Sequence, residues 1–346
     1  NHYGTPDEEN VPYVSEFGGY WSKTYNTDEL VRWIIEMDAE EEIIDEIVAA
    51  IGYDNDWCLH NPEFPRDSEF LSIDWKVFCK MLKHKVRYVF FKYPKKVKAD
   101  EYRKIEPAAI LEKIGRAIIG LNLLRRTDSE LFSNLQMYRA RQHKKTDKVK
   151  SCKSIGPLAP SEARGANRFS PPGIPMFYGS KKRSTAILEV IDRKKKNQIV
   201  TSALFKNIKP LTLVDLTKIP QLSIFDLDKA EFYEESVFLK QFARHISKKI
   251  KRGESQHFEY VPTQVITEYF RHVLSNEYDI PIDGLIYRSS IVEDDECYVI
   301  FASRRHCKDE GAETNQTKLV LVKNSFEKNQ VKGFRSKKVQ VFESRS

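Results

Sequence analysis

The sequence predicts an α+β protein in which a helical N-terminal part precedes a part that mixes strands and helices. Apolar residues recur at helical spacing over about the first 130 residues. Beyond residue 132, short apolar runs are divided by Pro, Gly and charged loops, as is typical of strands joined by turns. Because 346 residues exceed one typical domain, we expect two, at residues 1–128 and 129–346.

The N-terminal part is expected to form a helical bundle. Its helices are predicted at residues 27–35, 43–51, 75–86 and 108–124. Thr27 precedes two acidic residues and is the predicted N-cap of the first helix, and Gly52 ends the second. Residues 88–91 either continue the third helix or form a short buried extension.

The C-terminal part is expected to place helices against a sheet. Strands are predicted at residues 174–178, 199–205, 211–216, 284–287 and 297–302, and helices at 184–193, 232–250 and 263–274. Residues 308–317 are polar and predict a loop. The segments 318–322 and 338–342 alternate as surface strands do and are expected to cover or extend an edge of the sheet.

Charge gives little evidence for a nucleic-acid partner. Lys and Arg exceed Asp and Glu by 57 − 50 = 7, and both signs are interspersed, as on a solvated surface. The basic clusters at 193–196 and 248–252 lack interleaved aromatic residues that could stack on bases. Binding to RNA or DNA is therefore not predicted.

The cysteines favour neither a disulfide framework nor a metal site. There are five, with no CxxC pair among them. A reducing, cytoplasmic compartment is the simplest expectation. No apolar run approaches the roughly 20 residues that cross a bilayer, so we expect a soluble protein without a membrane partner.

Four separated segments carry polar groups next to expected strand ends. They are Tyr-Arg-Ala-Arg at 138–141, the stretch 167–178, Glu189, and Gly-Leu-Ile-Tyr-Arg-Ser-Ser at 284–290. In the second segment, Pro171, Pro172 and Gly173 predict a stiff turn between an Arg and a Tyr, because proline fixes φ and glycine permits positive φ. A rigid loop with an Arg, a Tyr and a nearby Glu suits an anionic ligand.

Taken together, these segments resemble the RES family, named for its Arg, Glu and Ser, whose members include toxins of bacterial toxin–antitoxin pairs. The resemblance covers roughly residues 131–305. Residues 78–91 also resemble the helical HEPN/RES-type domain that precedes the RES domain in one subgroup. The family is similar in fold to ADP-ribosyltransferase toxin cores, which implies a mixed β-sheet core here.

The resemblance implies an enzyme that consumes NAD as its substrate, with no bound cofactor or metal. Cleavage of the nicotinamide–ribose bond is implied, with water or inorganic phosphate as acceptor; another branch transfers ADP-ribose to a protein. The implied catalytic residues are Glu189, Arg139 and Ser289, and the implied binding residues are Arg168, Tyr178, Tyr138, Arg141 and Tyr287. An inactive binding module that recruits a partner through its helical domain is a third interpretation.

The residue types fit this chemistry. Breaking the glycosidic bond creates an oxocarbenium-like ribose, which a carboxylate such as Glu189 can stabilise. Arginine suits a diphosphate because its planar fork donates two parallel hydrogen bonds, and Arg139 and Arg168 are assigned that task. Nicotinamide leaves as a neutral group, so a second carboxylate is not required as it is in most glycosidases.

Each assignment has a structural alternative. Arg139 can be a buried ion-pair partner, with Arg141 binding the ligand instead. Glu189 can be a solvated helix residue, and Tyr178 can be core packing. Ser289 can be a turn residue or exchange roles with Ser290. A toxic activity also calls for control, by an antitoxin or by contact with the N-terminal domain, and self-association is left open.

Overall fold

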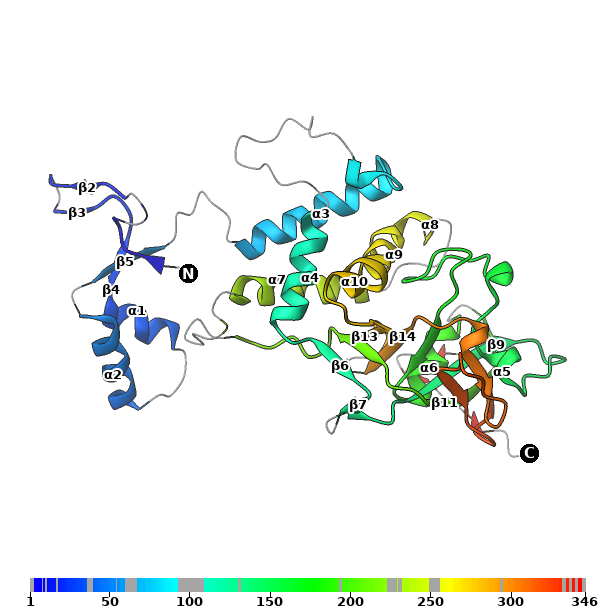
Figure 1. Ribbon diagram of the computed structural model, residues 1–346. Coiled ribbons are helices and arrows are strands. Elements are labelled where there is room, and N and C mark those ends of the chain that lie inside the picture. Colours follow the sequence, from blue (N-terminus) through cyan, green and yellow to red (C-terminus); the bar gives the residue numbers. More distant parts are fainter. Residues whose placement is uncertain are drawn as a thin grey trace. The chain divides into compact units, whose positions relative to one another are not determined.

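The computed structural model divides the chain into two compact units, Asn1–Phe70 and Leu71–Ser346 (Figure 1). It describes residues 3–7, 9, 11–16, 18–35, 40–53, 55–59, 67–92, 109–129, 132–192, 195–222, 229, 232–248, 256–292, 295–331, 334–335, 338–339 and 342–343. The units divide well before the boundary expected at 128/129. The reason is that the third and fourth predicted helices bury their apolar faces in the core of the second unit.

Unit 1 combines the two expected helices with short strands that the expected helical bundle did not include. Its elements are β1 (Tyr3–Gly4), β2 (Tyr13–Val14), β3 (Gly19–Tyr20), β4 (Thr24–Asn26), α1 (Thr27–Ile34), α2 (Glu41–Ile51) and β5 (Asp56–Leu59). Strands β1, β5 and β4 form a small antiparallel sheet. Helices α1 and α2 pack through Val31, Ile44 and Val48.

The N-cap of α1 is Asn26 and not Thr27. The Asn26 side chain accepts a hydrogen bond from the backbone N–H of Glu29 at 2.8 Å, and the Glu29 carboxylate accepts one from the N–H of Asn26 at 3.3 Å. This reciprocal arrangement is a capping box. Thr27 instead donates its hydroxyl to the carbonyl of Gly52 at 2.6 Å, which ties the start of α1 to the end of α2.

Unit 2 holds the remaining elements. Its helices are α3 (Asp67–His84, which begins in the last residues of unit 1), α4 (Ala109–Gly120), α5 (Cys152–Ile155), α6 (Arg183–Val190), α7 (Tyr233–Ser247), α8 (Gln256–Glu259), α9 (Val261–Glu268) and α10 (Ser275–Glu277). Its strands are β6 (Leu124–Arg126), β7 (Asp128–Ser129), β8 (Phe132–Ser133), β9 (Gln136–His143), β10 (Phe177–Ser180), β11 (Gln198–Asn207), β12 (Thr212–Asp215), β13 (Gly284–Arg288), β14 (Glu296–Ile300), β15 (Cys307–Asp309), β16 (Leu319–Leu321), β17 (Glu327–Val331), β18 (Phe334–Arg335), β19 (Lys338–Val339) and β20 (Phe342–Glu343).

One mixed sheet runs through unit 2 in the order β15-β16-β11-β9-β10-β14-β13-β12-β6, with β17 pairing with β11 and β20. The pairs β12–β13 and β15–β16 are parallel, and the neighbours between them are antiparallel. This agrees with the α+β expectation. Strand β9, which lies between β11 and β10 in the middle of the sheet, was not predicted.

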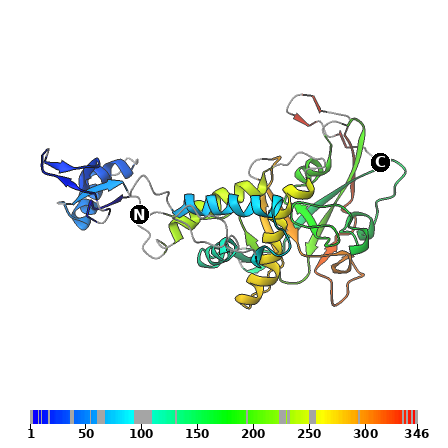
Figure 2. The same cartoon turned by 90° about the horizontal axis from the view of Figure 1, so that it is seen from above.

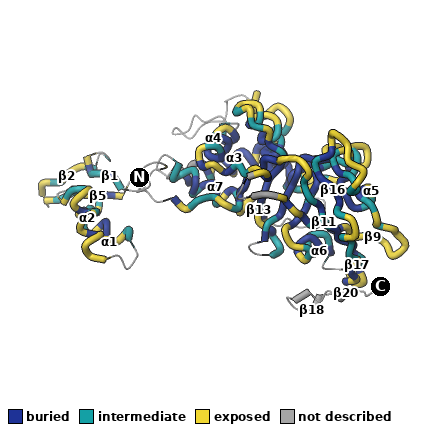
Figure 3. Tube along the Cα trace, turned by 60° about the horizontal axis from the view of Figure 1, so that its bottom comes forward, coloured by how far each residue is buried: buried dark blue, intermediate teal, exposed yellow. Residues whose placement is uncertain are grey.

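Both faces of the sheet are covered, which explains the nearly continuous apolar runs of its strands. Val214, Leu285 and Val299 face a core filled by α3, α4, α7 and α9. Their strand neighbours face a second core that includes Phe177 and Phe205. Helices α3 and α7 lie side by side in that first layer (Figure 2), where the Trp75 ring meets Phe242 edge to face. Burial is deepest along the strands, and exposed residues gather on the connecting loops (Figure 3).

Several predicted boundaries shift. Helix α4 ends at Gly120, and residues from Leu124 form β6. Residues 88–91 do not continue α3, which ends at His84. Tyr88 and Phe91 are exposed, whereas Phe90, in a 3₁₀ turn at Phe90–Lys92, packs against the core. The other shifts concern later segments. The strand expected at 174–178 begins at Phe177, the helix expected at 263–274 becomes a π-helical turn at Tyr269–Leu274, and the loop expected at 308–317 begins within β15.

Candidate functional site

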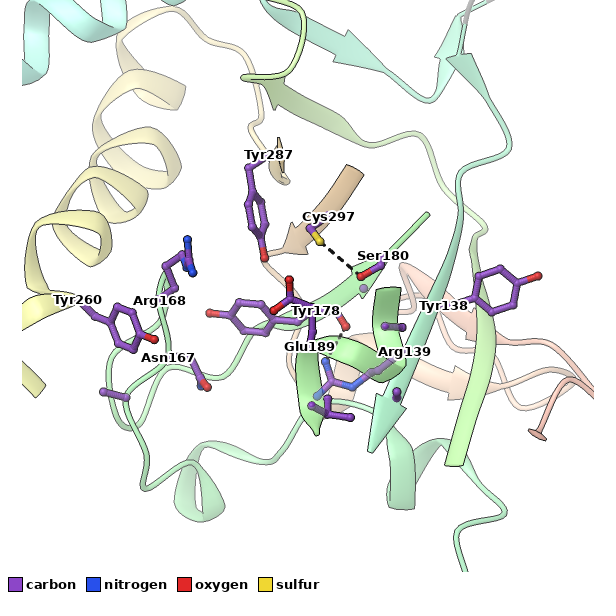
Figure 4. A pocket seen from close by; sticks show the side chains of 15 residues that line it. Tyr138, Arg139, Asn167, Arg168, Tyr178, Ser180, Glu189, Tyr260, Tyr287 and Cys297 are labelled. Carbon is purple, nitrogen blue, oxygen red and sulfur yellow. Dashed lines mark hydrogen bonds between the residues drawn. The ribbon is translucent and has the colours of Figure 1, made fainter. Parts of the chain in front are cut away.

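A cavity of about 450 Å³, called cavity 1 below, opens in unit 2 where the middle of the sheet meets α6 and a long loop (Figure 4). Five elements and two loop segments contribute to its wall. The lining residues are Tyr138, Arg139, Ala140, Ala166, Asn167, Arg168, Tyr178, Gly179, Ser180, Ala186, Glu189, Val190, Tyr260, Tyr287 and Cys297. Residues from all four predicted segments contribute to this wall.

Arg139 is a partly buried cation on β9. Its Nε donates to the carbonyl of Ile155 at 2.7 Å, and its Nη1 donates to the carbonyl of Tyr178 at 2.9 Å. The guanidinium also lies 5.2 Å from the centre of the Phe177 ring. It forms no ion pair with the described residues, so the ion-pair alternative finds no partner. Burial lowers the pKa of Arg139 to about 10, which still leaves it charged at neutral pH.

The turn at residues 171–174 has the conformation that its residues predict. The N–H of Ile174 donates to the carbonyl of Pro171 at 3.2 Å, and Gly173 has φ of 85°. Proline at the second position and a positive-φ glycine at the third define a type II turn. The N–H of Gly173 also donates to the carbonyl of Ala163 at 2.7 Å, which closes the loop on itself.

Tyr178 joins this loop to the sheet. Its ring leaves β10 beside the cavity, and its hydroxyl lies 2.9 Å from the hydroxyl of Ser170 and accepts from the N–H of Phe169 at 3.3 Å. Burial raises the pKa of Tyr178 to about 12, so the phenol is neutral at physiological pH. Tyr178 thus packs against the core, as in the structural alternative, and also lines the cavity, while its contact with a ligand stays a prediction.

Arg168 comes from the loop. Its Nη1 donates to the carbonyl of Ile246 near the end of α7 at 2.7 Å. The backbone carbonyl of Arg168 accepts from the hydroxyl of Thr263 on α9. The part of the chain that the structure describes offers this guanidinium no carboxylate partner, so its charge is available to an anionic ligand.

Glu189 is held in place from two directions. Helix α6 is tied to the chain ahead of β14 because Thr185 donates its hydroxyl to the buried carboxylate of Asp295. One helical turn further, the Glu189 carboxylate accepts the hydroxyl of Ser289 at 2.8 Å. Ala186 and Glu189 are three residues apart and share the helix face that lines the cavity.

Ser289 does not line cavity 1, but its hydrogen bond holds the Glu189 carboxylate in place. Its oxygen accepts from the N–H groups of Ile291 and Val292 at 3.1 and 3.3 Å, so it is also the turn residue of the structural alternative. Ser289 is therefore the turn residue of the structural alternative and a positioning residue for Glu189, while its predicted catalytic contact with a ligand stays a prediction. Ser290 lines a different cavity.

The other three predicted binding residues differ in their relation to cavity 1. The Tyr287 ring lines cavity 1 and packs 4.8 Å from Phe169, and burial raises its pKa well above the usual range. Tyr138 borders the cavity, but its ring points away from the other side chains (Figure 4) and lies under the Arg183 guanidinium at 4.7 Å. Arg141 is exposed, donates to the carbonyl of Ser154, and is not among the residues lining cavity 1.

Among the polar lining residues, the sequence interpretation did not assign Asn167, Ser180, Tyr260 and Cys297 to the site. Ser180 could have been found, because side chains two apart on a strand share a face and Tyr178 was already assigned. Cys297 pairs with Ser180 across β10 and β14, and their side chains lie 3.4 Å apart. A single sequence does not reveal which residues of two distant strands lie opposite each other, so Cys297 could not have been found in this way.

The described residues contain no group of three or more His, Cys, Asp or Glu side chains able to hold a metal ion. None of the helices among them is long and apolar enough to cross a membrane. The five cysteines are buried and free.

Two sequence families match the chain. The family described as RES domain matches residues 136–321, and the family described as HEPN/RES N-terminal domain 1 matches residues 1–96. No curated protein and no solved structure matches. The RES match contains every element that lines cavity 1, from β9 to β14.

Proposed function

Because the chain belongs to the RES domain family, we propose that it is a NAD-consuming toxin or defence effector that cleaves the nicotinamide–ribose bond. The observation that carries the proposal is one carboxylate, Glu189, fixed by Ser289 in the same cavity as two arginines without carboxylate partners among the described residues. One anion and two cations match a substrate with a cationic ring at one end and a diphosphate next to it.

Within this proposal the residues divide the work. Glu189 faces the ribose and stabilises the positive charge that develops as nicotinamide leaves. Arg139 and Arg168 bind the diphosphate from two sides, one from the sheet and one from the loop. Tyr178 and Tyr287 supply aromatic surface for the nicotinamide or ribose.

The reaction balances with either acceptor. The nicotinamide nitrogen takes the electron pair of the broken bond and leaves neutral. Water then adds its oxygen to the ribose carbon and releases a proton, giving ADP-ribose. Phosphate instead forms a new C–O bond and gives a phosphorylated ADP-ribose. The proposal extends to an ADP-ribosyltransferase-like core and to control by a regulatory protein, as the resemblance implies.

The test is to incubate the purified chain with NAD, with and without inorganic phosphate, and to measure nicotinamide and the ribosyl product by chromatography. We expect nicotinamide to appear in step with NAD loss. A phosphate requirement identifies a phosphorylase, and no requirement identifies a glycohydrolase. Label transferred from NAD to protein in a cell extract identifies an ADP-ribosyltransferase, and unchanged NAD under every condition contradicts the proposal.

A further inference from the structure

A second cavity, called cavity 2, has a volume of about 730 Å³ and shares no lining residue with cavity 1. It lies between α7, the chain after β12 and the end of β13. Its lining residues are Leu216, Thr217, Ile219, Gln221, Lys240, Ala243, Arg244, Ser247, Lys248, Arg288, Ser289 and Ser290. Ser289 connects the two cavities, because its hydroxyl donates to Glu189 at 2.8 Å.

A stripe of cations lines cavity 2. Lys240 and Arg244 are four residues apart and lie above one another on the same face of α7, and Lys248 follows directly after the last residue of the helix. None of the three forms an ion pair with the residues that the structure describes. Like charges at this spacing destabilise a helix, so the arrangement is unfavourable unless something anionic approaches it.

The helix dipole accounts for only part of this stripe. Arg244 and Lys248 lie at the carboxyl end of α7, where cations interact favourably with the unpaired carbonyls. Lys240 lies a full turn earlier, beyond the reach of that effect. Burial lowers the pKa of Lys240, and the charge of Arg244 lowers it further, so an anion beside this ammonium group would favour its charged form.

The rest of the lining matches a phosphate-bearing ligand. Thr217, Gln221, Ser247 and Ser290 add neutral hydrogen-bonding groups, and no carboxylate lines cavity 2 among the described residues. The volume is in the range of small-molecule sites and exceeds what a single phosphate ion fills. Leu216 and Ile219 add apolar surface to the same wall.

We propose that cavity 2 is a second binding site for a phosphorylated small molecule of nucleotide size, held by the cations of α7 and adjoining Ser289. The proposal concerns binding alone, so it does not depend on NAD cleavage in cavity 1. Because Ser289 also holds Glu189, occupancy of cavity 2 is positioned to alter the carboxylate of the candidate site.

The test measures binding of adenosine 5′-monophosphate and of inorganic phosphate by calorimetry, in a background carrying Arg168→Gln to weaken binding in cavity 1. The triple variant Lys240→Gln, Arg244→Gln and Lys248→Gln removes the stripe. The matched control, Lys144→Gln, Lys145→Gln and Lys148→Gln, removes three charges from the exposed segment after β9. Thermal unfolding shows that both variants fold.

We expect the triple variant to bind the nucleotide at least about tenfold more weakly than the control, whose affinity matches that of the background protein. Tighter binding of the nucleotide than of phosphate supports a nucleotide-sized ligand, and equal binding assigns the site to the phosphate group alone. Equal affinity of the triple variant and the control overturns the proposal, as does failure of the background protein to bind either probe.

Discussion

The two walls of cavity 1 are built differently. The sheet wall is formed by β9, β10, β13 and β14 with helix α6, and it includes Arg139, Tyr178, Glu189, Tyr287 and Cys297. The strands of this wall are fixed by backbone ladders whose register places Ser180 opposite both Tyr138 and Cys297. The loop wall, residues 166–168 with Tyr260, has no such ladder.

Side chains hold the loop wall instead. Gln264 donates its amide to the carbonyl of Asn167 at 2.8 Å, Thr263 donates to the carbonyl of Arg168, and Arg168 donates to Ile246 at 2.7 Å. A few such bonds open at lower free energy than a sheet in the core. Groups needed at fixed positions therefore belong to the sheet wall, while the loop wall can admit and release a ligand. Changes in the sheet wall should therefore lower kcat, and changes in the loop wall should raise KM.

The largest effect is expected at Glu189. Glu189→Gln keeps an oxygen that accepts the Ser289 hydroxyl but removes the charge that stabilises the ribosyl cation. We expect kcat for nicotinamide release to fall by about 10²- to 10³-fold with an unchanged melting temperature. Glu46→Gln on α2 of unit 1 is the matched control and should keep full activity. If Glu189→Gln retains more than about a tenth of kcat, the carboxylate is not the stabilising group.

The next largest effect is expected at Arg139, and Arg141 on the same strand provides the control. Arg139→Lys replaces a planar fork that bonds Ile155 and Tyr178 with a single ammonium, so one of these carbonyls loses its partner. We expect a loss of about 1–3 kcal/mol in the free energy of unfolding and a fall in kcat/KM of at least about tenfold. Arg141→Lys, two residues further along β9, should change neither. Urea unfolding and steady-state kinetics measure both variants, and equal effects would remove the distinction between buried and exposed arginines.

Much of the sheet was predictable from the sequence because β11 to β14 are buried on both faces and read as apolar runs. Strand β9 was not, because its residues Tyr-Arg-Ala-Arg-Gln-His include charged and amide side chains that are uncommon in a central strand. The sheet accepts Arg139 there because two backbone carbonyls from other segments satisfy its donors. Those carbonyls belong to the tertiary fold, so no local pattern could reveal them.

The part of the candidate site that could be predicted consists of charged and aromatic side chains whose chemistry suits an anionic ligand. Arg168, Tyr178 and Glu189 line one cavity, although the first and the last are 21 positions apart in the sequence. The sequence could not distinguish Arg139 from Arg141, because both share one strand face. They are about 7 Å apart along the strand, and only the structure shows where the cavity ends.

A third prediction concerns the turn at residues 171–174, in the same loop as residues 166–168 of the loop wall. Gly173→Ala places a side chain at φ of 85°, where L-residues are strained, although the added Cβ meets no atom within 4 Å. We expect a loss of about 1 kcal/mol in the free energy of unfolding, and a KM increase of a few fold with kcat unchanged. Gly165→Ala on the same loop also meets no atom within 4 Å and has no positive φ, so it should be neutral or slightly stabilising. A fall in kcat for Gly173→Ala would show that the loop wall also takes part in the chemical step.

The smallest effect concerns the tyrosine that joins the two walls. Burial raises the pKa of Tyr178 to about 12 in the folded state, above its usual value of about 10 in an unfolded chain. The folded state therefore binds more protons than the unfolded state between pH 10 and 12. This contribution to stability is fully present below pH 10 and is lost as the pH rises towards 12.

Tyr178→Phe removes this titration together with the contacts to Ser170 and Phe169. The variant should be less stable than the parent at pH 8, because two hydrogen bonds are lost. Its free energy of unfolding should then fall less steeply between pH 10 and 11, as measured by urea unfolding at fixed ionic strength. Tyr88→Phe, which alters an exposed ring, should keep the parental slope. Parallel curves for Tyr178→Phe and the parent would mean that the phenol ionises as easily in the folded chain as in the unfolded one, and that the loop does not seal it against the sheet.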